Sequence, residues 1–450
     1  MGAVHDFSVW ESLVGLVRAC NAEQLGVPGG VVSGQISLGA WSVPVPMAQA
    51  EALRAAMGAV EPVQDALRAD GSDRVTFMVE TAPDGETLLH VVDPGPAVEY
   101  GIRSPFVGAL LLVEGAVPEP WRRLPEAVPG AAAGPSADAE LLERVLRERL
   151  PDAIGATEAE IAEAEARLGV TLPDELKALY RVTRARWQDW SGDYAAQGRV
   201  WKAVGCELFP LDRLYIADAR SRPCPWMFAA TDVAVTAPDA AVQDLVGSPG
   251  WIAFGDNGGG DRVALDLTPG PGGHTGQVIM IDHERNIGAA LRAESLTDMV
   301  VNRRDEWSSG RDRNRQPLVA HVGDHGLGSV GAAAHPALEV LRISGWKGEP
   351  LSLAPLAGLP RMRTLTASPG ALADPLEIAG LKHLEYLSLG PKEWRVLLDA
   401  GAVPQNLLAA GIEIQGEQPP VPLLNLANEL LALRNRPLIT RTVLETDSSR

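Results

Sequence analysis

The sequence predicts an α+β protein of three regions, and two patterns carry that prediction. Between residues 138 and 302, amphipathic helix patterns precede three short strand patterns separated by glycine-rich turns. Between residues 335 and 437, a leucine pattern recurs every 22 to 24 residues. We expect the remaining region, residues 1–130, to form an α/β domain.

The N-terminal region contains signals for both helices and strands. The stretch WESLVGLVRAC (10–20) has leucine and valine at helical spacing, and residues 46–69 predict one or two helices interrupted at Pro62. The stretch RVTFMVETAPDGETLLHVVD (74–93) predicts a hairpin that turns at PDGE. No motif in this region points to a particular chemistry.

The central region opens with a clearly marked pair of helices. Thr157 followed by Glu160 predicts a capping box, and Gly169 predicts a left-handed residue that ends the first helix. Pro173 suits the first turn of the second helix. Further on we expect strands at 200–204, 206–209, 251–254, 262–267 and 277–281, and a helix at 238–246.

The C-terminal region contains a short repeat. Three segments align, HPALEVLRI (335–343), LPRMRTLTA (359–367) and LKHLEYLSL (381–389). Their spacing lies in the range of leucine-rich repeats, in which each unit adds one strand to a stacked sheet. Gly370 and Lys392 occupy the places where such repeats usually have asparagine, so we expect a short leucine-rich-repeat-like array with a weak turn ladder.

Composition and charge exclude several classes of function. The chain has 39 basic and 58 acidic residues among 450, a net charge of −19, which disfavours binding to nucleic acid or to an anionic membrane. Cys20, Cys206 and Cys224 are widely spaced and odd in number, and we expect neither a disulfide framework nor a zinc site. With no signal peptide and no long apolar run, a cytoplasmic protein is expected.

Three central stretches together resemble a known family. TEAEIAEAEARLGVTLPDELK (157–177), GDNGGGDRVALDL (255–267) and GQVIMIDHE (276–284) are similar to the opening helices and central hairpin of the SUKH superfamily, typified by the yeast cell-wall assembly regulator. The segment RVTRARWQDWSGD (181–193) departs from the family's pattern, which often has Asn-Gly there. The resemblance implies a small mixed domain that binds proteins, as in bacterial immunity proteins that block a co-encoded toxin.

The glycine-rich stretch GDNGGGD (255–261) allows three interpretations. A phosphate site is disfavoured, because the stretch lacks the P-loop ending and leads into a strand rather than a helix. A metal site is disfavoured on two grounds. The EF-hand ligand spacing needed for calcium is missing. For zinc, His274 and His283 do not share a helical face. A hairpin loop is favoured, since glycine adopts positive φ and Asp and Asn bond to nearby backbone.

No catalytic arrangement is visible. The sequence has no GxSxG, no HExxH and no cysteine with an evident histidine partner, so we expect no enzyme, no cofactor and no metal. An enzyme with an unfamiliar site in the N-terminal region remains an alternative. The tryptophans of WQDW are either core residues or anchors of an interface.

We therefore expect a non-enzymatic, cytoplasmic binding protein. The first hypothesis is an immunity-type protein whose acidic surface neutralises a basic toxin domain; residues 151–300 contain 13 basic and 22 acidic residues. The second is a regulatory or scaffold protein that binds a partner through the leucine-rich-repeat-like face. The candidate partner-binding residues are Trp187, Asp189, Trp190, Asp193, Asp256, Asn257 and Asp261.

Overall fold

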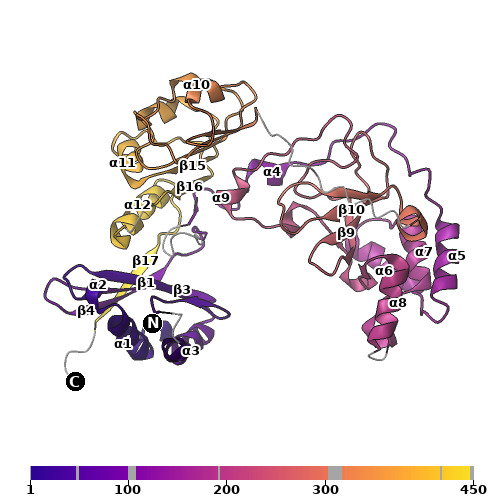
Figure 1. Ribbon diagram of the computed structural model, residues 1–450, viewed down its shortest axis with the longest axis horizontal. Helices are drawn as coiled ribbons and strands as arrows, with labels where there is room; N and C mark the ends of the chain where they lie inside the picture. Colours follow the sequence, from indigo (N-terminus) through magenta and orange to yellow (C-terminus); the bar gives the residue numbers. More distant parts are fainter. Residues whose placement is uncertain are drawn as a thin grey trace. The chain divides into compact units, whose positions relative to one another are not determined.

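The computed structural model describes residues 2–46, 50–99, 108–190, 193–302, 317–415 and 418–445. The chain divides into two compact units, and it is α+β, as predicted (Figure 1). Unit 1 contains residues 1–116 and 320–450, and unit 2 contains residues 117–319. Most of the charged connector RRDEWSSGRDRNRQP (303–317) lies outside the described residues. No helix in the described part of the chain is both long and apolar enough to cross a bilayer.

Unit 1 contains two sheets. Its elements are η1 (Ala3–His5), η2 (Phe7–Val9), α1 (Glu11–Cys20), α2 (Ala22–Leu25), β1 (Val31–Ser37), β2 (Trp41–Ser42), α3 (Ala50–Asp70), β3 (Arg74–Thr81), β4 (Thr87–Asp93), β5 (Leu110–Leu111), β12 (Val319–Val322), α10 (Val330–Ala333), β13 (Val340–Ile343), η7 (Ala354–Leu356), β14 (Thr364–Ala367), η8 (Pro375–Gly380), β15 (Tyr386–Leu389), α11 (Pro391–Asp399), β16 (Ala409–Ile412), α12 (Pro420–Ala432) and β17 (Thr440–Glu445). Their strand orders are β17-β4-β3-β1-β2 and β12-β13-β14-β15-β16-β5.

The first sheet is antiparallel in every pair, so the N-terminal region is not the α/β domain that the sequence suggested. The predicted hairpin at 74–93 is confirmed, and its short turn forces β3 and β4 to run in opposite directions. Helices α1 and α3 cover one face, where the core includes Leu13, Val63 and Phe77. Helix α3 continues through Pro62 instead of breaking there.

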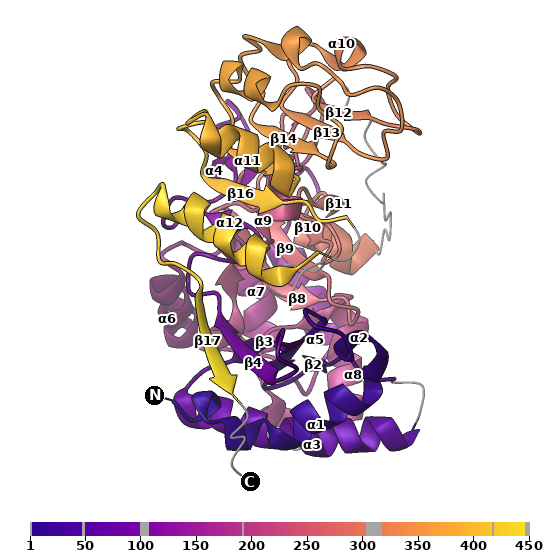
Figure 2. The ribbon, with the colours of Figure 1, turned by 90° about the vertical axis from the view of Figure 1, so that its left-hand side faces the viewer.

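The C-terminal strands close the N-terminal sheet. Strand β17 pairs with β4 along its whole length, as Figure 2 shows, and β5 pairs with β16 in return. Residues 1–116 of the predicted N-terminal region and the predicted region 335–437 therefore share one compact unit. Residues 117–130 belong to the other unit, where the Trp121 indole donates to the carbonyl of Arg222 at 2.9 Å.

The repeat segments form neighbouring parallel strands. Strands β13, β14, β15 and β16 are aligned so that Leu341, Leu365, Leu387 and Ala410 lie side by side in the core. The backbone before each strand is bonded to the next unit: the carbonyl of Glu339 accepts from two amides of the following segment. The spacing and alignment are those the sequence predicted, whereas assignment to the leucine-rich-repeat class stays a prediction.

Unit 2 is a sheet with helices on one face and an irregular segment on the other. Its elements are α4 (Glu119–Arg122), α5 (Ala139–Arg149), α6 (Glu158–Leu168), α7 (Asp174–Val182), η3 (Trp187–Trp190), α8 (Tyr194–Val204), β6 (Glu207–Leu208), η4 (Leu211–Arg213), β7 (Tyr215–Ile216), η5 (Ala219–Ser221), α9 (Trp226–Ala229), β8 (Trp251–Asp256), β9 (Arg262–Asp266), β10 (Gln277–Ile281), β11 (Ala290–Ala293) and the π-helical turn η6 (Asp298–Asn302). The strand order is β11-β10-β9-β8-β6, with β7 also paired to β8.

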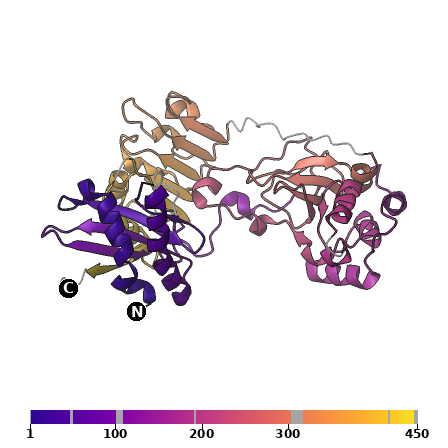
Figure 3. The ribbon, with the colours of Figure 1, turned by 60° about the horizontal axis from the view of Figure 1, so that its bottom comes forward.

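Alternation along the strands of unit 2 divides the core into two layers. Phe254, Val263 and Leu265 face helices α5 to α8, which gather on one side of the sheet (Figure 1, Figure 3). Trp251 and Ala264 face the opposite way, toward the segment around Leu245. The predicted capping box of α6 and the left-handed Gly169 after it are both present.

Two segments of unit 2 differ from the prediction. Residues 200–204 are the last turns of α8 rather than a strand, because Asp193 caps the start of that helix and Gly205 ends it in the left-handed region. Residues 238–246 form turns rather than a helix. The Gln243 side chain there forms hydrogen bonds with the backbone of residues 126, 268 and 269. These bonds satisfy backbone polar groups that have no partner in a regular helix or strand.

We predict that residues 117–319 fold alone. Their three core clusters contain residues of this segment only, so excision exposes no large core surface. Urea denaturation of the excised segment, followed by circular dichroism, should show one cooperative transition. The fragment 1–116 is the comparison: it lacks β17 and the array strands, and it should show no such transition. A non-cooperative 117–319 fragment would contradict the division.

Candidate functional site

The glycine-rich hairpin joins β8 to β9, and its side chains bond back to its own backbone. Asp256 accepts from the amide of Gly258 at 2.5 Å, and Asn257 accepts from the amide of Gly259 at 2.7 Å. Gly258 and Gly260 have φ angles of 81° and 106°, which residues other than glycine rarely adopt. The hairpin interpretation of GDNGGGD is therefore confirmed.

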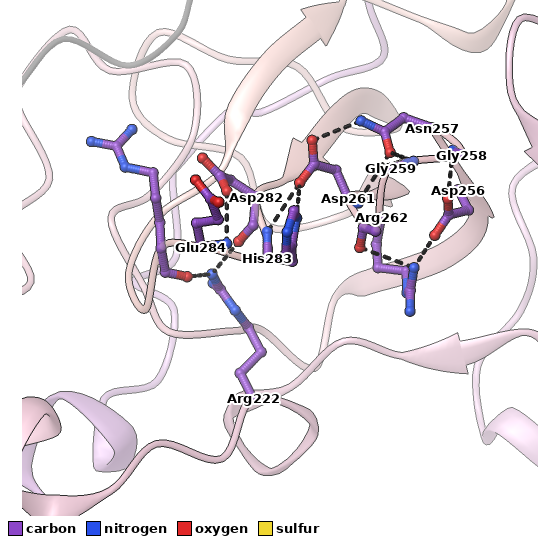
Figure 4. Close-up of polar contacts among 12 residues, drawn as sticks. Arg222, Asp256, Asn257, Gly258, Gly259, Asp261, Arg262, Asp282, His283 and Glu284 are labelled. Atoms are coloured by element: carbon purple, nitrogen blue, oxygen red, sulfur yellow. Dashed lines mark hydrogen bonds and ion pairs between the residues drawn. The ribbon is translucent and has the colours of Figure 1, made fainter. Parts of the chain in front are cut away.

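Asp261 connects this hairpin to the end of β10 (Figure 4). Its side chain is only 10% exposed, and one carboxylate oxygen accepts from the backbone amide and the Nδ1 atom of His283, at 3.1 and 2.7 Å. The other oxygen accepts from the Asn257 amide at 2.7 Å. A side chain at Gly260 would meet the His283 ring at 3.2 Å, so glycine permits this close approach.

The contact moves the pKa of both partners. The hydrogen bond to Asp261 is the main cause that raises the pKa of His283 above its ordinary value of 6.5. For Asp261, burial acts to raise the pKa, but the bonds from the His283 side chain and backbone outweigh it, and the pKa is lowered. Both shifts therefore favour the charged form of each partner.

Asp282 completes a trio that sequence reasoning missed. Ligand-type atoms of Asp261, Asp282 and His283 lie within 4.8 Å of one another, which suits a divalent cation. However, the hydrogen bond between Asp261 and His283 already uses two of these atoms. The trio is therefore satisfied without an ion, and we assign no metal to it.

The acidic residues of the hairpin offer little free charge. Asp256 forms an ion pair with Arg262, and Asp261 is bonded internally as described. A partner that needs exposed carboxylates would find them engaged. The role of Asp256, Asn257 and Asp261 in partner binding stays a prediction.

A second group of predicted residues forms an aromatic cluster at the surface. Trp187 is 42% exposed and lies edge-on to Trp190, with ring centres 6.1 Å apart. Tyr194, which is 75% exposed, packs against Trp187 at 4.9 Å. Trp190 packs partly against the domain core, and Asp193 caps α8. Sequence reasoning missed Tyr194, although it begins the helix that Asp193 caps.

An open pocket of about 690 Å³ lies beside this cluster. Trp187 and Trp190 line it together with Arg184, which binds Asp189 through two hydrogen bonds of 2.7 Å. The hydrogen bond from Arg184 lowers the pKa of Asp189. Among the described residues that line the pocket, none is a serine, cysteine, histidine, lysine or tyrosine. Its wall thus combines arginines held in ion pairs with the carboxylates of Glu207 and Asp212.

Helix α8 links the two groups of predicted residues. Tyr194 at its start belongs to the aromatic cluster, and Trp201 near its end lies against the hairpin, where a side chain at Gly258 would meet the indole at 2.5 Å. The seven predicted residues thus fall into two clusters joined by one helix. Gln197 of α8 also lines the pocket.

Comparison with known proteins agrees with this geometry. Residues 155–302 match the SMI1 / KNR4 family (SUKH-1). The match supports a SUKH domain at these residues. The match begins after α5, so it covers most but not all of the predicted region 138–302.

Fungal regulators are among the relatives. The chain is 25% identical over 206 residues to the glucan synthesis regulatory protein of Neurospora crassa, covering 38% of each chain. It is 31% identical over 86 residues to the cell wall biosynthesis/cell cycle regulator smi1 of Schizosaccharomyces pombe, covering 18% of this chain and 17% of that one. A KNR4/SMI1 homolog of Yarrowia lipolytica is 43% identical over 47 residues, 10% and 7% of the two chains. The matches thus span less than two-fifths of each relative.

We predict that Gly260→Ala destabilises unit 2 by about 1–3 kcal/mol, because alanine is strained at this φ and meets the His283 ring. Gly259→Ala is the matched control: Gly259 lies in the same loop without a positive φ, and its change should stay within about 0.5 kcal/mol. Urea denaturation measures both. Equal losses would show that backbone conformation at residue 260 does not limit the loop.

We also predict a pH dependence from His283. A raised pKa means that its contribution to stability is complete below pH 6.5 and is lost as the pH rises through the raised value. In His283→Gln the free energy of unfolding should change less with pH across that window. In His274→Gln it should change with pH as it does in the native chain. Urea midpoints at a series of pH values test this. An unchanged slope in His283→Gln would contradict it.

Proposed function

We propose that this chain is a non-enzymatic regulatory protein that binds a protein partner through its SUKH domain. The observation that carries the proposal is the surface cluster of Trp187, Trp190 and Tyr194 beside the pocket. Tryptophan and tyrosine are enriched among the residues that dominate binding energy at interfaces. Large aromatic side chains exposed together on a soluble domain therefore suit a contact with another protein.

The relatives' names support regulation over toxin neutralisation. Two of the fungal relatives are named as regulators of glucan synthesis or of cell wall biosynthesis and the cell cycle. The toxin hypothesis required exposed acidic charge, and the hairpin carboxylates that were to supply it are engaged internally. We therefore place this chain in a regulatory role, and we expect it to act in the cytoplasm.

The pocket supports the non-enzymatic part of the proposal. Arg184 is held by both Asp189 and Glu160, and Arg186 is held by Glu160 at 3.0 Å. The side chains of Arg184 and Asp189 therefore already have partners within the wall and are not free to act on a substrate. The ion pairs keep the pocket wall in place next to the aromatic cluster.

We further propose that residues 335–437 form a leucine-rich-repeat-like array that serves as a structural support. The parallel strands and their 22- to 24-residue spacing support this assignment. Among the strand residues that point away from the leucine core, Val340, Thr364, Tyr386 and Ala409 are buried, whereas Arg342 is exposed and Thr366 is half-buried. This face is therefore a weaker candidate for partner binding than the aromatic cluster.

The double variant Trp187→Ala/Tyr194→Ala tests the proposal. We predict that it captures the partner from native lysate at least about tenfold less than the native chain, because such anchors typically contribute more than 1 kcal/mol each. Phe228→Ala is the matched control, since Phe228 is exposed to the same 42% as Trp187 within the same unit. Quantitative mass spectrometry of the captured proteins gives the comparison. Equal enrichment by all three chains would contradict the proposal.

A further inference from the structure

One complete face of α8 is exposed. Positions at helical spacing along it point to solvent, namely Tyr194, Ala195, Gly198, Arg199, Trp201 and Lys202. The opposite stripe, Val200, Ala203 and Val204, packs into the core of unit 2. An exposed helix face normally carries charged and polar residues of both signs. This one carries two large aromatic side chains, two cations and no acid.

Two exposed aromatic side chains flank a glycine on this face, and we call the stretch between Tyr194 and Trp201 the notch. Tyr194 and Trp201 are 75% and 38% exposed, and they stand two helical turns apart, about 10 Å along the axis. Gly198 lies between them, and the space where its side chain would stand is open. Trp187 packs on Tyr194 and extends the apolar surface at that end. The gap therefore leaves room for an apolar side chain of a partner between two aromatic walls.

The charged part of the face is cationic. Arg199 is paired with Asp193 at 3.6 Å, but both side chains are more than half exposed, so this pair is weak. Lys202 is exposed and has no ion pair within the described part of the chain. At the end of the helix, Arg292 donates to the carbonyl of Gly205 at 2.7 Å and places a further cation there. Positive charge thus follows the aromatic notch along α8.

We infer that this face docks an acidic segment of the protein partner that also carries an apolar side chain for the notch. The inference rests on the proposed function and adds the chemistry of the partner to it. Carboxylates of the segment would meet Arg199 and Lys202, while its apolar side chain would lie between Tyr194 and Trp201. The net charge of the chain suggests a basic partner, whereas this face suits an acidic one.

Single-stranded nucleic acid also binds cations interleaved with aromatic rings. Here the face offers only two exposed cations, whereas the affinity of nucleic acid depends on several phosphate contacts. The chain as a whole carries a net charge of −19, and this field repels a polyanion at long range. A short acidic peptide segment carries less charge and gains from the notch, so the observations favour it.

The test selects ligands without assuming a sequence. Displayed random 15-residue peptides are selected on the full chain, and the selected pool is then measured by fluorescence anisotropy against variants. We expect peptides enriched in Asp or Glu together with an aromatic or large aliphatic residue. Arg199→Glu/Lys202→Glu should bind the pool at least about tenfold more weakly. Arg144→Glu/Arg220→Glu, which changes the net charge equally at exposed sites of the same unit, should bind as the native chain does.

Three results would overturn the inference. They are a pool without acidic enrichment, undiminished binding by Arg199→Glu/Lys202→Glu, and tighter binding of a labelled 15-nucleotide oligo(dT) than of any peptide. Capture of the lysate partner separates this inference from the proposed function. If the partner is lost with Trp187→Ala/Tyr194→Ala but kept with Arg199→Glu/Lys202→Glu, the function stands and the acidic segment does not.

Discussion

The burial of one stripe of α8 determines which residues of that helix are exposed on the surface of unit 2. Val200, Ala203 and Val204 recur at the spacing of a helix and pack with residues of the sheet and of the neighbouring helices. Because a helix has a fixed period, burying these positions turns Tyr194 and Trp201 outward. Caps at Asp193 and Gly205 fix where the helix begins and ends. The aromatic and cationic surface is thus a direct consequence of core packing.

The glycine-rich hairpin has a structural role that its composition conceals. Its acids look like ligands or a charged rim, yet their oxygens accept bonds from the loop backbone, from Arg262 and from His283. A buried carboxylate that turned toward a binding partner would lose its internal hydrogen bonds. The loss of these bonds would cost stability, so the carboxylate stays with its internal partners. The hairpin therefore holds two strand ends together and supports the ring of Trp201, which lies against Gly258.

Local signals were predictable from the sequence, and contacts between distant segments were not. The capping box at Thr157, the helix end at Gly169 and the hairpin turns each depend on a few adjacent residues, and all were found. Valine and tryptophan in the segment 200–204 predict a strand, because both favour strands, whereas the caps Asp193 and Gly205 outside that window make it helical. The pairing of β17 with β4 joins residues more than 340 positions apart, and no local pattern reports it.

The candidate site was partly predictable for the same reason. WQDW identified Trp187, Asp189 and Trp190, because tryptophans so close in sequence must lie close in space. Tyr194 and Arg184 join that cluster through the turn into α8 and an ion pair, which require the backbone path. His283 meets Asp261 only because two strand ends converge at one edge of the sheet, 22 residues apart in the chain. Hairpin register, rather than residue type, creates that contact.

Net charge is a poor guide to the partner of such a domain. Exposed charges act over about 8 to 10 Å at physiological ionic strength, so a contact senses the groups around it rather than the sum over 450 residues. On the exposed face of α8 those groups are Arg199 and Lys202, with Asp193 at the start of the helix, although the chain as a whole is strongly acidic. The acids elsewhere keep the molecule soluble and repel polyanions. A cationic, aromatic patch on an acidic protein therefore restricts binding to ligands that are acidic only locally, which suits a regulator that must select one segment of one partner.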